Sequence, residues 1–375
     1  MYAPRVRQGF HVPPAITPFL LAVVAILATV ASWAVFMVRT TSNETGYAVL
    51  SPVVPESVRS VAYALSEGTE DTIFVRRADG SDAPRAIASF SSTFVNLHIR
   101  GSASPAADRL AVLRLNSATD AGKLAFVDLP AGGVREVEAD FDYLSAMAWA
   151  HDGGRIALTR TSSLANSGET LTAVSEVTTA SGAVAEIGRF EGASQVVPVG
   201  YSLDGERVFV VVVDPSGSAL WSLWRRQASM LTRFSAGPTR DWSLSPDSTR
   251  LAFVDRLGVG ERAYAGRILM IATERVTDAA DGGNQLGAVW RRGAATADFG
   301  GPDGSLMLTE PSPGAYVLPL QWSPDGSTLA ASVFAPATEA GAEPTDSVEI
   351  VTPARRLPLS ERGTARFLGF VRDGD

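Results

Sequence analysis

Histidine and cysteine supply most metal-binding and nucleophilic chemistry in proteins, and this chain has three histidines and no cysteine. His11, His98 and His151 stand far apart, without the short paired spacing from which imidazole metal sites are built. Disulfides, thiol catalysis and thiolate metal sites are excluded, because each needs cysteine. The sequence therefore predicts no metal site and no cofactor.

A serine nucleophile is equally poorly supported. The nearest approach to a nucleophile elbow is the segment Gly200-Tyr201-Ser202-Leu203-Asp204. The Gly-x-Ser-x-Gly elbow of α/β-hydrolases ends on glycine, and this segment ends on aspartate. The pair Gly258-Val259-Gly260 lacks the further glycine of a phosphate-binding loop, and no Gly-Lys-Ser/Thr element exists. No catalytic residue is predicted, and we do not expect an enzyme.

Two Trp-Arg-Arg triplets are the remaining candidates for a binding role. They are Trp224-Arg225-Arg226 and Trp290-Arg291-Arg292. Tryptophan and arginine are the side chains most enriched at binding hot spots, so we expect these triplets to contact a protein partner. The alternative is a buried tryptophan that ends a strand, with its arginines in solvent. This alternative applies above all to Trp224, because Leu220 to Leu223 are typical of a blade strand.

A turn-and-strand unit recurs along the chain and must position any such site. Its fullest copy runs from Trp322 to Ala330 with the sequence WSPDGSTLA. Weaker copies begin at Ser245, Ser202, Trp149 and Ser104. Proline presets φ, and aspartate and glycine tolerate the positive φ of a tight turn. The apolar alternation that follows each turn is typical of a half-buried strand.

The strands that follow these turns begin roughly every 40–50 residues, which is the length of a four-stranded propeller blade. Their first residues are Ser60, Arg109, Arg155, Arg207, Arg250 and Thr328. The last interval is longer and predicts an insertion within residues 275–310. Ala365–Val371 resembles the strand that should precede Ser60–Leu65, so we expect the first and last strands to share one blade.

The sequence therefore predicts an all-β, six-bladed β-propeller over residues 59–375. Seven blades are the alternative, if Pro302-Asp303-Gly304 running into Ser305–Leu308 opens a degenerate blade. Pairing of the two chain ends would remove the exposed sheet edges that invite aggregation.

The unit from Trp322 to Ala330 resembles the TolB-type β-propeller repeat of bacterial envelope proteins. The unit at Ser245 matches nearly as well, those at Trp149 and Ser202 match in part, and that at Ser104 is weakest. Propellers of this type are scaffolds, periplasmic adaptors and gating domains of peptidases, and no catalytic residue set accompanies the repeat. Nothing in the chain resembles the separate N-terminal domain of TolB itself. The resemblance thus implies a fold and a binding role.

Residues 15–38 form an uncharged apolar segment, AITPFLLAVVAILATVASWAVFMV. As a helix it would be roughly 36 Å long, enough to cross a hydrocarbon core of about 30 Å. We therefore predict a single transmembrane helix at 15–38, a cytoplasmic tail at 1–14 and a linker at 39–58. The alternative is a cleaved signal peptide ending near Ser32-Trp33-Ala34, but the apolar run exceeds the usual signal-peptide core.

The flanking charges predict the orientation of this helix. Arg5 and Arg7 precede it, whereas Arg39 is soon followed by Glu44. The positive-inside rule then places the N-terminus in the cytoplasm and the propeller outside the cell membrane. Small side chains at helical spacing would let a second membrane helix approach closely, the alternative being a lipid-facing alanine-rich surface. This candidate packing face consists of Ala22, Ala25, Ala28, Thr29 and Ser32.

The overall charge bears on the class of partner. The formal net charge is −8, and Lys123 is the only lysine among 32 basic residues, so nucleic acid is not an expected partner. We expect a membrane-anchored extracytoplasmic scaffold or accessory subunit, with the bilayer and a protein of the membrane or envelope as its partners. A glycosidase or lyase using carboxylates at the mouth of the propeller channel is the alternative, and a small-ligand sensor there is another.

Overall fold

A computed structural model describes residues 58–373 of the chain, except 68, 92–98, 117–118, 120, 165–167, 259–262, 280–283, 302–314, 336–344 and 361–364. The expected tail at 1–14, the transmembrane helix at 15–38 with its small-residue face, and nearly all of the linker at 39–58 lie outside these residues. No helix among the described residues is long and apolar enough to cross a membrane. Residues 54–375 form one compact unit.

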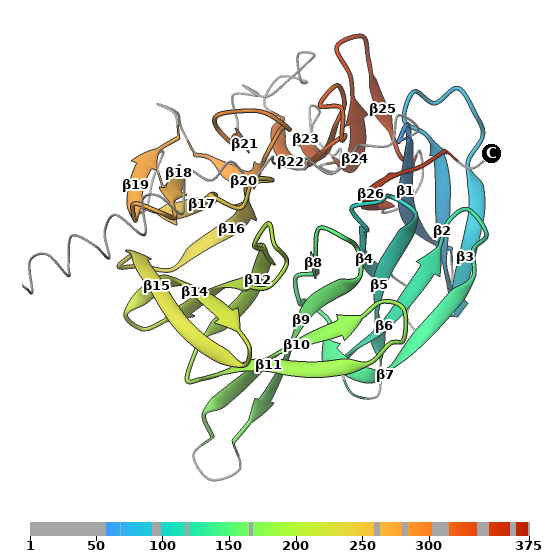
Figure 1. The fold of residues 1–375 in the computed structure, drawn as a ribbon. Coiled ribbons are helices and arrows are strands. Elements are labelled where there is room, and N and C mark those ends of the chain that lie inside the picture. The colour runs from blue at the N-terminus through green and yellow to red at the C-terminus, as the bar shows by residue number, and fades with distance from the viewer. Residues whose placement is uncertain are drawn as a thin grey trace, which may run out of the picture. The chain divides into compact units, whose positions relative to one another are not determined.

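The described residues form an all-β, six-bladed β-propeller whose four-stranded antiparallel sheets follow one another along the chain (Figure 1). Blade 1 joins the two ends of the unit, in the order β26 (Ala365–Val371), β1 (Ser60–Glu67), β2 (Glu70–Arg77) and β3 (Arg85–Ser91). Blade 2 consists of β4 (Ile99–Ala103), β5 (Arg109–Asn116), β6 (Ala121–Asp128) and β7 (Val134–Asp142). Blade 3 consists of β8 (Ala148–Trp149), β9 (Arg155–Ser163), β10 (Thr170–Thr178) and β11 (Val184–Glu191).

The second half of the unit repeats the same four-stranded sheet. Blade 4 consists of β12 (Gln195–Tyr201), β13 (Val208–Asp214), β14 (Gly217–Trp224) and β15 (Gln227–Ser235). Blade 5 consists of β16 (Thr239–Leu244), β17 (Arg250–Arg256), β18 (Tyr264–Met270) and β19 (Arg275–Asp278). Blade 6 consists of β22 (Tyr316–Trp322), β23 (Leu329–Ala335), β24 (Thr345–Val351) and β25 (Arg356–Pro358).

The first and last strands pair as the sequence predicts. β26 is antiparallel to β1, with Ser60 opposite Val371 and Leu65 opposite Ala365. β26 also packs against β4 of the next blade, where a Cβ on Gly369 would come within 2.5 Å of the Ala103 Cβ. Blade 1 is therefore completed by the C-terminal strand, which leaves neither end of the repeat unpaired.

The insertion expected within 275–310 is present as a small extra sheet. β20 (Leu286–Val289) and β21 (Asp298–Gly300) pair with each other between blades 5 and 6, and β20 contacts strands of both. Among the described residues this two-stranded sheet is the only trace of a seventh blade. Pro302-Asp303-Gly304, the expected start of a degenerate blade, lies outside the described residues.

The sheets are buried on both faces, which explains why several strands are continuously apolar. In β13 every residue from Val208 to Val213 is buried. Because side chains alternate across a strand, one set packs on blade 3 and the other on blade 5. The set toward blade 3 is Val208, Val210 and Val212, and the set toward blade 5 is Phe209, Val211 and Val213.

The repeated turn works as its sequence indicates. In the fullest copy, the Ser323 hydroxyl donates to the Asp325 carboxylate at 2.5 Å and accepts from the Thr328 amide at 3.0 Å, while Gly326 has φ +71°. In the weakest copy Ala107 takes the positive φ (+58°), and the Ser104 hydroxyl bonds Asp108 instead at 2.9 Å. The turn therefore forms even where alanines replace its aspartate and glycine.

Candidate functional site

The hairpin that joins β14 to β15 is the most distinctive exposed feature among the described residues. Trp224 pairs with Gln227, so Arg225 and Arg226 form a two-residue loop. Their φ values of +49° and +64° are those of a type I′ turn, which favours asparagine and glycine. The sequence predicted neither this loop nor its geometry, because arginine is not a turn residue.

The corresponding hairpins of blades 1, 2 and 3 have longer loops, in each of which a glycine takes a positive φ, whereas Glu274 takes it in blade 5. Gly80, Gly132 and Gly182 have φ values of +63°, +74° and +74° in the hairpins of blades 1, 2 and 3. A residue other than glycine in the left-handed region costs of order 1 kcal/mol, and such strain gathers at functional sites. Blade 4 therefore carries two strained arginines at a position where glycine would serve stability better.

Trp224 is held in place although its side chain is exposed. The side chain is 37% exposed, and its Nε1 donates a hydrogen bond to the Glu206 carboxylate at 3.2 Å. The guanidinium of Arg225 lies 4.5 Å from the centre of the Trp224 ring, and that of Arg207 lies 5.8 Å from it. These contacts fix the indole, so little side-chain entropy would be lost when a partner binds it.

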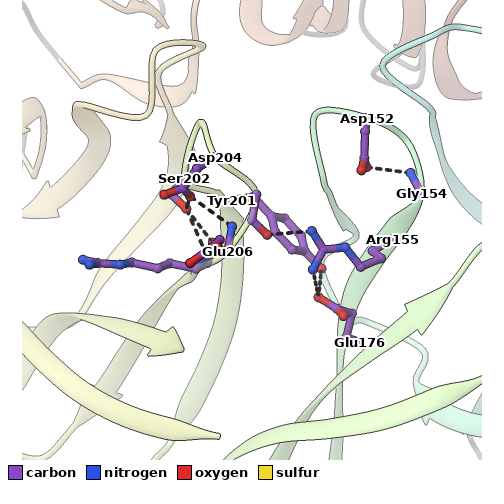
Figure 2. Close-up of polar contacts among 10 residues, drawn as sticks. Asp152, Gly154, Arg155, Glu176, Tyr201, Ser202, Asp204 and Glu206 are labelled. Carbon is purple, nitrogen blue, oxygen red and sulfur yellow. Dashed lines mark hydrogen bonds and ion pairs between the residues drawn. The ribbon is translucent and has the colours of Figure 1, made fainter. Parts of the chain in front are cut away.

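Glu206 can orient Trp224 because blade 3 anchors the turn that carries it. Figure 2 shows Arg155 and Tyr201 beside each other, both directed at Glu176, near the turn that carries Ser202, Asp204 and Glu206. Arg155 pairs with Glu176 at 3.2 Å and donates to the Gly205 carbonyl at 2.7 Å. The buried Tyr201 hydroxyl donates to the same Glu176 carboxylate at 3.0 Å. A chain of contacts therefore runs from the third blade to the exposed indole of the fourth.

The environment of this network shifts the pKa values of Tyr201 and Asp204 in opposite directions. Burial, and then the negative charge of Glu176, raise the pKa of Tyr201, so its hydroxyl stays neutral and donates. Burial also acts to raise the pKa of Asp204, but hydrogen bonds from Ser202 and from the Glu206 amide outweigh it, and the pKa lies below its ordinary value. The hydroxyl of Ser202, the serine of the incomplete nucleophile elbow, donates a hydrogen bond to the Asp204 carboxylate at 2.5 Å and so stabilises the turn.

The second triplet has the opposite arrangement. Trp290 is buried, at 8% exposure, and its indole donates to the Ser243 carbonyl at 2.9 Å. Arg291 and Arg292 are exposed, and the Arg291 guanidinium lies 5.0 Å from the Trp322 ring centre. The buried-tryptophan alternative therefore describes Trp290. From the sequence, Trp224 was expected to be the more buried of the two tryptophans. This expectation was wrong, because Trp224 is the last residue of its strand and its side chain is exposed.

A pocket of about 510 Å³ lies against the first strands of several blades. β4 contributes Arg100 and Ser102, β26 contributes Arg366 and Phe367, and blade 6 contributes residues of β22, β23 and β24, including Asp346. A neighbouring hollow of about 320 Å³ shares Arg100 with it. Nothing in the sequence marked these residues, because three blades bring them together.

Metal chemistry finds no support in the described ranges, where no three His, Asp or Glu side chains gather in a way that could hold an ion. His151, at a repeat turn, has its Nε2 3.3 Å from the Ser248 hydroxyl of blade 5. His11 and His98 lie outside the described residues.

Comparisons with known proteins identify the fold. No family model and no curated protein matches the sequence. The chain is similar in structure to TolB from Acinetobacter baumannii, with a TM-score of 0.50 and 16% identity over 85% of this chain and 69% of that one. It is similar to the propeller domain of the Trilobed protease from Pyrococcus furiosus, with a TM-score of 0.53 and 12% identity over 81% and 95%. For the acylaminoacyl peptidase of Pyrococcus horikoshii the TM-score is 0.57, with 13% identity over 81% and 51%.

At these identities the likeness shows the fold alone. The similar structures include TolB, whose repeat the sequence resembles, and propeller domains of peptidases. The expected β-propeller is confirmed.

Proposed function

We propose that this chain is a membrane-anchored binding protein, an accessory or scaffolding subunit of a membrane or envelope complex, and that the Trp224 hairpin contacts its protein partner. The observation that carries this proposal is the strained Arg225-Arg226 loop beside an exposed, hydrogen-bonded tryptophan. Glycine would relieve the strain, and strained residues of this kind gather at functional sites, which supports a binding role for the two arginines.

The chemistry of the hairpin selects an acidic partner. Arg207 and Arg225 lie over the indole, Arg226 is the next residue of the loop, and Glu206 is the nearby carboxylate. Arginine binds carboxylates through two parallel hydrogen bonds, and an exposed tryptophan supplies a large apolar contact at low entropic cost. A protein surface that presents Asp or Glu side chains around an apolar cleft fits this arrangement.

The location outside the cell membrane is part of the proposal and is supported by the sequence. The apolar segment 15–38 is long enough to cross a bilayer, and the charges that flank it favour a cytoplasmic N-terminus. The glycosidase or lyase alternative needs two carboxyl groups facing one another. The described lining of the 510 Å³ pocket instead combines Arg100 and Arg366 with Asp346, which favours binding over such catalysis.

The test is the native mass of the tagged full-length chain, extracted from its own membranes in mild detergent. We compare the unaltered chain with Trp224→Ala and with Arg225→Asn/Arg226→Gly, which keeps a type I′ turn while removing both charges. Loss of a hot-spot contact of about 2 kcal/mol weakens binding roughly 30-fold, so both variants should migrate without the partner. The matched control is Glu274→Gly, which relieves a positive φ of +55° in the corresponding hairpin of blade 5 and should leave the complex intact.

Two outcomes would contradict the proposal. If the unaltered chain migrates alone, it is not a stable subunit. If Ala25→Leu/Ser32→Leu dissociates the complex while the hairpin variants leave it whole, the contact belongs to the membrane segment and the hairpin assignment fails.

A further inference from the structure

The 510 Å³ pocket contains two arginines that have no carboxylate partner among the described residues. Arg100 is on β4 and Arg366 is on β26, and these neighbouring strands contact each other. A Cβ on Gly101 would come within 2.9 Å of Leu368, which shows how closely the two strands approach. Both arginine side chains are half-buried.

Most other half-buried arginines near strand ends have an acidic partner. Arg155 pairs with Glu176 at 3.2 Å, and Arg356 pairs with Glu349 at 2.7 Å. Within the described part of the chain, no carboxylate lies within ion-pair distance of Arg100 or Arg366. Burial, and then the positive charge of Arg366, lower the pKa of Arg100, so the two cations are close enough to repel each other.

The one described carboxyl in the pocket lining, that of Asp346, forms no ion pair with either arginine. Burial raises the pKa of Asp346, with no arginine acting to lower it. Asp346 is on β24, which contacts β26, and it lines the same pocket as the two arginines. The pocket therefore has a cationic end at Arg100 and Arg366, where a bound anion would replace the missing partner.

The rest of the lining suits a small amphiphilic ligand. Met147, Leu320, Val348 and Phe367 supply apolar surface. Ser102 and Ser332 supply hydroxyl groups that form no hydrogen bond within the described residues. The volume of about 510 Å³ lies in the usual range of small-molecule sites, roughly 300–1,000 Å³.

We infer that this pocket binds a small organic oxyanion, whose carboxylate or phosphate head lies between the guanidinium groups of Arg100 and Arg366 and whose apolar body packs against Phe367, Leu320 and Val348. Guanidinium groups bind both kinds of head through paired hydrogen bonds, so the geometry specifies an oxyanion and the experiment distinguishes the two. The site shares none of its residues with the Trp224 hairpin and does not depend on the function proposed for it.

The test is calorimetric titration of the full-length chain in detergent at low ionic strength with butyrate, butyl phosphate and the uncharged butanol. We expect saturable binding of butyrate, of butyl phosphate or of both, and none of butanol. Hydrogen bonds to charged groups are strong enough that Arg100→Gln or Arg366→Gln should each weaken binding about tenfold or more. Arg256→Gln, which removes an exposed arginine outside the pocket, should leave binding unchanged.

A thermal melt without ligand separates binding from a structural role. Since Arg100 has no ion partner in the described part of the chain and lies near a like charge, Arg100→Gln should melt at the same temperature as the unaltered chain or higher. The inference would be overturned if neither butyrate nor butyl phosphate binds, if butanol binds as tightly as they do, or if Arg256→Gln weakens binding as much as the pocket variants. A clearly lower melting temperature of Arg100→Gln would also overturn it, because it would show that the guanidinium serves the fold.

Discussion

The double substitution Arg225→Asn/Arg226→Gly should stabilise the propeller while removing its proposed binding surface. Each arginine stands at positive φ, +49° and +64°, at a cost of about 1 kcal/mol per residue. Asparagine and glycine are the residues that a type I′ turn favours, so the substitution should recover about 2 kcal/mol. The lost stacking of Arg225 on Trp224, at 4.5 Å from the ring centre, offsets roughly 0.5–1 kcal/mol of this. The expected net gain is about 1 kcal/mol.

Urea unfolding of the full-length chain in detergent measures this difference in the free energy of unfolding. For a domain of this size a gain of about 1 kcal/mol also raises the melting temperature by roughly 2 °C. The reciprocal control is Gly182→Ala in blade 3, where φ is +74° and the new Cβ would meet the Arg135 guanidinium at 3.4 Å and the Val137 side chain at 3.8 Å. This control should lose about 1 kcal/mol. A double variant less stable than the unaltered chain by 1 kcal/mol or more would refute the strain argument, and the case for a binding hairpin would lose its main support.

Three further predictions concern the fold that carries the sites. Gly369→Ala places a Cβ 2.5 Å from the Ala103 Cβ at φ +145° and should lower the free energy of unfolding in urea by about 3 kcal/mol. The control Gly168→Ala, whose new Cβ lies in open space, should lower it by about 1 kcal/mol. Equal costs would contradict the close packing of β26 on β4. Burial raises the pKa of Tyr201, so above about pH 10 this tyrosine ionises only in the unfolded state and the free energy of unfolding falls. In Tyr201→Phe the free energy of unfolding should fall less steeply between about pH 8 and 11. An unchanged slope would contradict this prediction. The pKa of Asp325 is lowered because hydrogen bonds from Ser323 and Ser327 outweigh its burial, so its contribution to the free energy of unfolding is present above about pH 4 and is lost as the pH falls. Asp325→Asn should cost about 0.5 kcal/mol at pH 7 after solvent screening and should make the loss of stability in acid less steep. An unchanged loss of stability in acid would show that Asp325 does not cause it.

The repeated turn made the architecture predictable. Proline, aspartate and glycine restrict the backbone locally, so a Ser-Pro-Asp-Gly segment indicates its turn without reference to the rest of the chain. The second strand of each blade could be placed because it follows such a turn, and the pairing of β26 with β1 was predicted from the strand-like segment at Ala365–Val371. The sequence left the blade count open between six and seven, since the longer interval before Thr328 could hold either an insertion or a degenerate blade.

The candidate sites were only partly predictable. Trp224, Arg225 and Arg226 could be singled out by residue type, but their exposure depends on where β14 ends and on the anchoring of Glu206 by blade 3. Trp290 is also followed by two arginines, but it is buried because it packs with Ala252 and Val254 of blade 5, where the Ser243 carbonyl accepts the hydrogen bond from its indole. Local sequence does not encode this difference.

The sequence by itself determined the turn chemistry, the strand repeat and the apolar segment at 15–38, because each depends on residues close together in the chain. Only the tertiary structure decided which tryptophan is exposed and that Arg100 and Arg366 face one pocket. Those two arginines are separated by most of the propeller in sequence and become neighbours when β26 completes blade 1 beside β4. The physical reason is that ring closure brings the two ends of the repeat together, and no local pattern records which side chains then meet.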